Sequence, residues 1–313
     1  MTFAAFFTPM RAGRVVVTNL GAVARRRARA QKHTVARASS STSSLSSEIS
    51  NYDAMEVLRF PALSDNYGFA IRCARTNAVA LVDAPEEDAI TRALEDAKWP
   101  APSAMLNTHW HGDHVGANEG LRKRFPGMAV HAPKAEVGKI RGRVDVEVGE
   151  GDVVRVGDLE CEVRETPGHT LGHVVYHFKT QERVFVGDTL FALGCGRLFE
   201  GTPAQMWSSI SKILAMPDAT EVYCAHEYTL ANAKFALSVD PTNEDLQKRA
   251  REIEAMRADG KPTVPTTVGL EKLTNPFCRP DSVGVQRGVN MEGSKDLAAV
   301  FGAVRAAKDN FSN

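Results

Sequence analysis

The 313-residue sequence has little cysteine, and its five cysteines form no pattern. They are scattered and include no Cys-x-x-Cys pair, lying at Cys73, Cys161, Cys195, Cys224 and Cys278. Secreted proteins that depend on disulfides carry an even set of cysteines at regular spacings. The odd number and the scatter argue against a disulfide framework and favour a reducing compartment.

The sequence also lacks a long apolar run and an excess of one charge. No run approaches the ~18 apolar residues that would suggest a membrane span. The 38 basic residues equal the 38 acidic ones, but residues 1–47 carry seven Arg, one Lys and no acid. The remainder therefore has 38 − 8 = 30 basic against 38 acidic residues, a charge of −8. This acidic body argues against a nucleic-acid surface, and we expect neither a nucleic-acid nor a membrane partner.

The N-terminal segment lacks acidic residues until Glu48 and is rich in arginine, alanine and serine, with a serine-rich run at 39–47. This composition is typical of an organellar transit peptide. We therefore predict that residues 1–50 form a disordered transit peptide and that the protein resides in a mitochondrion or plastid. A disordered basic arm that binds an acidic partner is the alternative.

The rest of the chain is long enough for a large core and two domains. Alternating apolar residues predict strands at 56–60, 68–73 and 78–82, an amphipathic helix at 86–98, and further short strands up to residue 226. Helical spacing follows at 228–239, 243–256 and 295–309. We predict a catalytic domain at 53–226 and a helical, substrate-binding domain at 227–313.

A histidine-rich stretch follows an apolar strand predicted at 102–107, and it reads Thr108-His-Trp-His-Gly-Asp-His-Val-Gly-Ala-Asn118. Imidazole nitrogens and carboxylate oxygens suit zinc, iron and similar metals. One histidine alone would be explained as a loop or core residue, but packing has no use for so many costly polar groups together. We predict that this stretch supplies four metal ligands: His109, His111, Asp113 and His114.

Three later strand ends carry further ligands, namely His169, Asp188 and His226. Taken singly, the two histidines would be structural and the aspartate a helix N-cap or a turn residue. Together with the first stretch they predict two ions, one bound by His109, His111 and His169, the other by Asp113, His114 and His226, with Asp188 bridging. Two cations that share a water lower its pKa, so that hydroxide is available as a nucleophile, with Asp113 and Asp188 as the catalytic carboxylates.

With these motifs the chain closely resembles the metallo-β-lactamase superfamily and, within it, the glyoxalase II (hydroxyacylglutathione hydrolase) family, from Met55 to the C-terminus. The more specific stretches are Pro61-Ala-Leu-Ser-Asp-Asn-Tyr67, Gly187-Asp-Thr-Leu-Phe-Ala-Leu-Gly-Cys-Gly-Arg-Leu-Phe-Glu-Gly-Thr202, Cys224-Ala-His-Glu-Tyr-Thr-Leu-Ala-Asn-Ala-Lys-Phe-Ala236, Asn275-Pro-Phe277 and Arg305-Ala-Ala-Lys-Asp309. The resemblance implies an α+β fold, an αββα sandwich with a C-terminal helical domain. It also implies hydrolysis of S-D-lactoylglutathione to D-lactate and glutathione, the second step of methylglyoxal detoxification.

The resemblance further implies roles for single residues. All seven metal ligands match, and the expected cofactors are two divalent ions, zinc first, with iron or manganese as alternatives. Arg197 and Tyr228 match positions that contact glutathione, and Arg305 and Lys308 match a basic pair that grips its glycine carboxylate. Phe199 stands where some members carry a tyrosine, so one hydroxyl contact is missing. Without the family, Arg305 and Lys308 would be placed on an exposed helix face. The expected partner is a small glutathione thioester, and the expected state a monomer.

Three other functions compete. A persulfide dioxygenase of the same superfamily holds one iron and shares the Gly-Cys-Gly-Arg run, but residues 198–202 and the long tail after His226 argue against it. A tRNA-processing nuclease would need a basic surface. A non-catalytic scaffold would not need seven metal-ready side chains.

Overall fold

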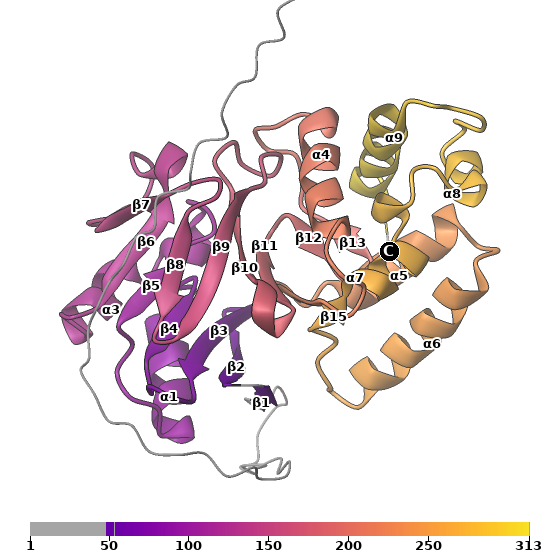
Figure 1. Cartoon of the computed structure of the whole chain (residues 1–313). Coiled ribbons are helices and arrows are strands. Elements are labelled where there is room, and N and C mark those ends of the chain that lie inside the picture. The colour runs from indigo at the N-terminus through magenta and orange to yellow at the C-terminus, as the bar shows by residue number, and fades with distance from the viewer. Residues whose placement is uncertain (1–47, 53, 313) are drawn as a thin grey trace, which may run out of the picture.

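Two β-sheets pack face to face, with helices on the outside (Figure 1). The computed structural model describes residues 48–52 and 54–312. The first sheet has the order β1-β2-β3-β4-β5-β6-β7 and the second β15-β14-β11-β10-β9-β8, with a separate β12-β13 hairpin. The predicted αββα sandwich and its helical C-terminal region are confirmed.

The strands of the first sheet are β1 (Glu48–Tyr52), β2 (Met55–Ala62), β3 (Asn66–Cys73), β4 (Val79–Val82), β5 (Ala104–Leu106), β6 (Ala129–Pro133) and β7 (Val146–Val148). Those of the second are β8 (Val153–Val156), β9 (Leu159–Glu165), β10 (Val174–Phe178), β11 (Arg183–Gly187), β14 (Glu221–Cys224) and β15 (Thr266–Thr267). The hairpin consists of β12 (Leu190–Phe191) and β13 (Gly194–Cys195).

The helices before residue 226 are α1 (Glu87–Ala97), α2 (Gly112–Val115), α3 (Asn118–Arg124), η1 (Lys134–Glu136), η2 (Lys179–Gln181) and α4 (Pro203–Leu214). Those after it are α5 (Thr229–Val239), α6 (Glu244–Ala258), α7 (Val268–Thr274), η3 (Pro276–Cys278), α8 (Val283–Gly288) and α9 (Leu297–Asp309). In Figure 1 the helices α5, α6, α8 and α9 gather on the right of the sandwich.

Alternation of the side-chain direction along the strands divides the apolar residues into two cores. In β4, Ala80 and Val82 face the core between the sheets, whereas Val79 and Leu81 face a second core under α1 and α3. Because successive strand side chains point to opposite faces, an apolar run with both faces covered becomes a fully buried strand. The sheets are thereby fixed on both sides and hold the loops at their edge.

Local signals set several helix boundaries. In α4, the Thr202 side chain accepts from the Gln205 backbone N–H, the Gln205 side chain accepts from the Thr202 N–H, and Pro203 occupies the first turn. This reciprocal capping satisfies two backbone donors that would otherwise have no partner. The helix therefore begins at Pro203 and packs Met206, Ile210 and Ile213 into the larger of the two cores.

The N-terminal boundary differs from the sequence prediction. β1 pairs with β2 over Glu48–Tyr52, so the last residues assigned to the predicted segment 1–50 belong to a strand. Residues 1–47 lie outside the described part of the chain. Among the described helices, none combines the length and the apolar character that a bilayer crossing requires.

Candidate metal centre

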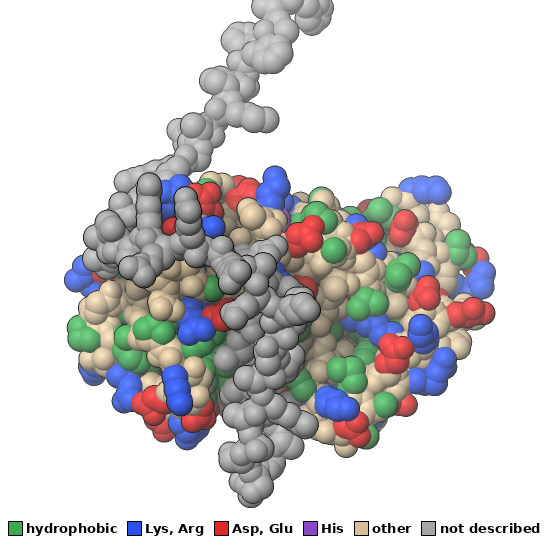
Figure 2. Space-filling model, turned by 60° about the horizontal axis from the view of Figure 1, so that its bottom comes forward, with side chains coloured by type: hydrophobic (Ala, Val, Ile, Leu, Met, Phe, Trp, Pro, Cys, Tyr) green, Lys and Arg blue, Asp and Glu red, His purple; other side chains and the backbone are tan. Residues whose placement is uncertain are grey.

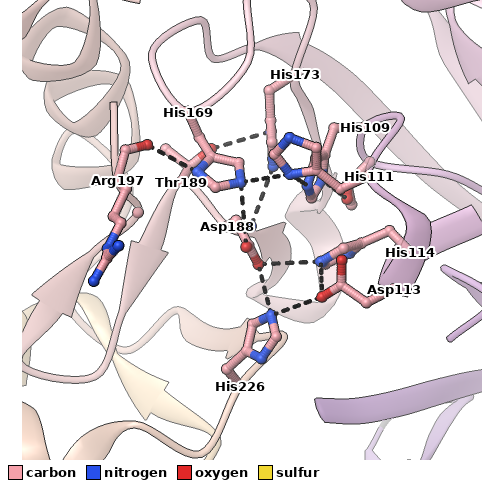
Figure 3. A network of polar contacts seen from close by, with 12 residues as sticks. His109, His111, Asp113, His114, His169, His173, Asp188, Thr189, Arg197 and His226 are labelled. Carbon is pink, nitrogen blue, oxygen red and sulfur yellow. Dashed lines mark hydrogen bonds and ion pairs between the residues drawn. The ribbon is translucent and has the colours of Figure 1, made fainter. Parts of the chain in front are cut away.

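Strand ends bring the seven predicted ligands together from distant parts of the chain (Figure 3). His109 and His111 follow β5, and the short helix α2 places Asp113 and His114 one turn later. The other three follow strands of the second sheet: His169 follows β9, Asp188 follows β11 directly, and His226 follows β14. The edge where strands of both sheets end is therefore the position of the cluster.

The first group within the cluster consists of His109, His111 and His169. The Nδ1 atom of His111 lies 3.0 Å from His109 Nε2 and 2.9 Å from His169 Nε2. Three ring nitrogens thus converge on one point, as the ligands of a single ion do.

The second group consists of Asp113, His114 and His226. The Oδ2 atom of Asp113 lies 3.4 Å from His114 Nε2 and 3.3 Å from His226 Nε2. Asp113 is the most exposed member, with 37% of its side chain accessible. This group is therefore open to solvent on the Asp113 side.

Asp188 lies between the groups and faces both. Its Oδ2 atom is 3.3 Å from His169 Nε2, and its Oδ1 atom is 3.3 Å from His114 Nε2 and 3.4 Å from His226 Nε2. A carboxylate with one oxygen on each side is suited to bridge two cations.

The backbone around Asp188 needs a glycine before it. Gly187 has φ +48°, and an added Cβ would lie 2.6 Å from Thr108 Oγ1 and 2.8 Å from His173 Nε2. Only glycine tolerates this close approach without displacing its neighbours. His173 is not a member of either group; its Nε2 accepts the Asp188 backbone N–H at 3.1 Å and so holds the bridging residue.

Carboxylates outside the seven support the cluster, and the sequence analysis assigned none of them. Asp83 Oδ2 accepts from His114 Nδ1 at 2.8 Å, and Asp83 Oδ1 accepts from the Thr108 N–H at 2.7 Å. Buried Glu136 accepts the N–H groups of Trp110 and Gly172, which holds the loop of the first two ligands against the loop of His169. Asp83 could have been predicted from the sequence, because it too is a polar residue directly after an apolar strand.

The cluster is built to attract positive charge. Burial raises the pKa of the Asp188 carboxyl, but the imidazoles of His114 and His226 outweigh this and hold the pKa well below its usual range. Burial lowers the pKa of His226, but Asp188 and Asp113 outweigh it and raise the pKa to about 10. Burial together with neighbouring imidazoles lowers the pKa of His109 well below its usual value. The Asp188 carboxylate between the two groups therefore keeps its negative charge at neutral pH, which favours a cation beside it.

The donor set fits metal ions. His114 Nε2 and Asp188 Oδ1 are shielded from solvent, face each other, and make no hydrogen bond within the described residues. Buried polar atoms without a partner cost free energy, and a cation between them would remove that cost. Imidazole and carboxylate donors are the ligands that zinc, iron and manganese accept.

Two of the five predicted substrate-binding residues flank the cluster on opposite sides. The exposed ring of Phe199 stands edge-on to His111 and His169, with centroids 5.6 and 5.3 Å away. The Tyr228 ring stacks on His226, with centroids 4.7 Å apart and planes 5° from parallel. Each group of ligands thus has one aromatic residue beside it.

The three predicted basic residues behave differently from one another. Arg305 is buried, donating to the Cys195 carbonyl at 2.9 Å and to Asp309 Oδ1 at 2.8 Å, so the exposed helix face considered for it is wrong.

Lys308 is half-buried, and its Nζ donates to the Ala231 carbonyl at 3.3 Å. Burial, with the nearby guanidinium groups, lowers the pKa of Lys308 to about 8. Arg197 is exposed, its Nε 3.9 Å from Asp309 Oδ1. Of the three, Lys308 and Arg197 are accessible to a ligand, whereas Arg305 is buried.

Comparison with known families gives two matches that meet at residue 226. The family model described as Metallo-beta-lactamase superfamily matches residues 67–226, and the one described as Hydroxyacylglutathione hydrolase C-terminus matches residues 227–311. Proteins named hydroxyacylglutathione hydrolase are similar over most of the chain. The one from Maricaulis maris is 49% identical over 82% of this chain and 98% of its own length, and the one from Rhizobium meliloti 50% identical over 82% and 99%.

Solved structures agree on the fold. The BLEG-1 B3 metallo-beta-lactamase superposes with a TM-score of 0.54 at 22% identity, covering 71% of this chain and 99% of that one. ETHE1 from Myxococcus xanthus superposes with a TM-score of 0.52 at 27% identity, covering 79% and 98%.

The relatives correct one prediction from the sequence. They come from bacteria, which contain neither mitochondria nor plastids, so the predicted organellar location is wrong. The prediction depended on the composition of the N-terminal segment alone, and a basic, serine-rich composition can arise without any targeting role. Residues 1–47, which carried it, lie outside the described residues.

Proposed function

Because the chain belongs to the hydroxyacylglutathione hydrolase family of the metallo-β-lactamase superfamily, we propose that it hydrolyses 2-hydroxyacylglutathione thioesters. The expected substrate is S-D-lactoylglutathione. Water adds its oxygen to the thioester carbonyl carbon, the C–S bond breaks, and the products are D-lactate and glutathione. The observation that carries the proposal is the convergence of seven donor side chains, from both sheets, in a chain whose relatives bear this name.

The proposed cofactors are two divalent ions, with zinc as the first candidate and iron or manganese as alternatives. His109, His111 and His169 would hold one ion, Asp113, His114 and His226 the other, and Asp188 both. When bound, such ions polarise the thioester carbonyl and make water a better nucleophile.

The chain's own residues arrange the rest of the reaction. The Arg197 carbonyl accepts from His169 Nδ1 at 2.9 Å, which leaves Nε2 of that ring to face the cluster. The leaving sulfur needs no protein acid, because a thiol has a pKa of about 8.5 and departs readily as thiolate. Binding of the glutathione moiety is proposed for Phe199 and Tyr228, the two aromatic residues beside the cluster.

The carboxylates of glutathione need cationic partners, and the chain offers Lys308 and Arg197 near one another. Asp309 contacts both Arg305 and Arg197, so it holds the two guanidinium groups on the same helix end. We propose that Lys308 and Arg197 contact the substrate and that buried Arg305 supports them through its contacts with the Cys195 carbonyl and Asp309.

The other functions considered from the sequence are not favoured. The C-terminal residues 227–311 match a hydroxyacylglutathione hydrolase family model, which a dioxygenase of the superfamily would not require. On the face shown in Figure 2, the basic and acidic side chains of the described residues are interspersed, so a nuclease is not supported there. We further propose that the enzyme acts as a monomer and needs neither a nucleic-acid nor a membrane partner.

The test is a direct assay with the full-length chain loaded with zinc. Loss of the thioester absorbance of S-D-lactoylglutathione, with matching release of D-lactate, is the expected result. His111→Ala should abolish turnover and lower the metal content. The control Asp158→Asn changes an exposed residue paired with Arg75 and should alter neither quantity. No turnover by fully loaded protein would refute the proposal, and oxygen uptake with glutathione persulfide would favour the dioxygenase.

A further inference from the structure

The turn between β2 and β3 belongs to the family-specific stretch Pro61-Ala-Leu-Ser-Asp-Asn-Tyr67, yet it supplies none of the seven ligands. Hydrogen bonds between backbones join it to the chain around His226. The Tyr67 N–H donates to the Ala225 carbonyl at 2.7 Å, and the Glu227 N–H donates to the Asp65 carbonyl at 2.9 Å. A turn of the first sheet is thus fastened to the end of β14 in the second.

Side chains of the same turn hold two ligands of the second group. His226 Nδ1 donates to Asp65 Oδ1 at 2.7 Å, and Asn66 Nδ2 donates to Asp113 Oδ2 at 3.0 Å. A carboxylate can only accept, so when His226 binds an ion through Nε2, its remaining proton is on Nδ1. The lone pair of Nε2 then faces the cluster, where this atom lies 3.3 Å from Asp113 Oδ2.

The two groups of ligands differ in what orients their imidazoles. In the first group the partners are neutral: the Thr108 hydroxyl lies 3.0 Å from His109 Nδ1, and the Arg197 carbonyl accepts from His169. In the second group both histidines have carboxylate partners, Asp83 for His114 and Asp65 for His226. A carboxylate partner fixes the ring orientation and increases the basicity of the ligating nitrogen.

Asp65 differs from Asp83 in acting on the second group alone. Asp83 also accepts hydrogen bonds from the backbone N–H and the hydroxyl of Thr108, the residue before the first-group ligand His109. The side chain of Asp65 contacts Ser64, His226 and the hydroxyl of Tyr228, whose ring stacks on His226. A change at Asp65 should therefore affect one ion and leave the other.

We propose that Asp65 is a positioning residue that holds His226 with Nε2 toward the second ion and thereby sets the affinity of that ion selectively. The proposal rests on the two-ion site proposed above and concerns binding of metal, independently of turnover. A carboxylate partner of a ligating histidine contributes about 10–100-fold in metal affinity.

The experiment compares the full-length wild type with Asp65→Ala, Asp65→Asn and the surface control Asp158→Asn. Each protein is stripped with a chelator and titrated with Zn²⁺ against a chelating indicator, which yields the two stepwise binding constants. For Asp65→Ala we expect one binding step to lose about 10–100-fold and the other step to stay within about twofold. Asp65→Asn keeps an oxygen that accepts from His226 Nδ1, so it should recover part of the loss. Thermal unfolding of the stripped proteins shows that each variant is folded.

The outcomes distinguish failure of the role of Asp65 from failure of the proposed two-ion hydrolase site. A wild type with two equivalents of zinc and an Asp65→Ala variant with the same two constants would overturn the role of Asp65 and leave the hydrolase intact. Equal weakening of both steps would also overturn it, because a general loss of structure predicts that result. A wild type that binds fewer than two equivalents would overturn the two-ion site and this assignment together.

Discussion

Glu271 offers a quantitative test of how the helical region is joined to the rest of the fold. Its side chain is fully buried and accepts four hydrogen bonds: from Arg249 at 2.6 Å, Thr266 at 2.6 Å, Asn275 at 2.8 Å and the Leu193 N–H at 2.9 Å. Leu193 lies in the turn of the β12-β13 hairpin. The carboxylate therefore connects α7 to the segment between Asp188 and Arg197.

Glu271→Gln keeps the shape and removes the charge. The new amide nitrogen replaces one of the two oxygens, so it faces donors, and the buried Arg249 loses its counter-ion. Leaving one partner of a buried ion pair uncompensated costs about 3–5 kcal/mol. We expect the free energy of unfolding to fall by that amount.

The matched control is a surface ion pair made by Lys272, the next residue of the same helix, with Asp218. Lys272 and Asp218 are 2.6 Å apart, but 38% and 72% of their side chains are exposed. Exposed pairs contribute at most about 1 kcal/mol, so Asp218→Asn should lower stability by no more than that.

The assay is urea unfolding of chelator-treated protein, so that metal binding does not add to the difference. Circular dichroism and tryptophan fluorescence should give coincident transitions before a single free energy is assigned. A loss below about 1 kcal/mol for Glu271→Gln, equal to that of the surface pair, would refute the role of the buried carboxylate.

Three further predictions concern the active site. Asp188→Asn should lower kcat/KM by at least about 100-fold, because a charge facing both ion positions is lost; metal analysis beside the kinetics checks it, and an unchanged rate would contradict it. KM should rise above pH 8, by up to about tenfold per unit, because the pKa of Lys308 is about 8 and only its protonated form attracts a carboxylate. Lys308→Met should abolish that rise in a pH series; its persistence would place the carboxylate elsewhere. Phe199→Tyr should lower KM about 2–13-fold at constant kcat if the new hydroxyl bonds the glutathione backbone, and steady-state kinetics decide it.

The repeated position of ligands at strand ends made the cluster predictable from sequence. His109, His169 and His226 each follow an apolar run closely, and strands that end at one edge bring such residues together. The gathering of these ligands follows from the topology of the sheets, so it could be predicted without knowing any distance. Asp83 directly follows β4 in the same way and could have been predicted as part of the site.

Other features depend on contacts that the sequence does not encode locally. Strand β10 carries Tyr176 and His177, and its apolar pattern is too short to separate from a buried helix segment. The α2 helix is a single turn inside the histidine-rich stretch. The burial of Arg305 depends on the Cys195 carbonyl, 110 residues earlier, and no periodicity in a helix predicts such a contact.

The backbone hydrogen bonds of Tyr67 and Glu227 act as a clasp between the two sheets at the rim of the metal cluster. Sheets joined at this rim have no hinge there, so the solvent-open side of the cluster at Asp113 does not widen by movement of one sheet against the other. The shape of the entry for a bulky thioester would then depend on exposed side chains beside the cluster, such as Phe199. If relatives accept different acyl groups, they should therefore differ in the exposed side chains beside the cluster, while the backbone around it stays the same.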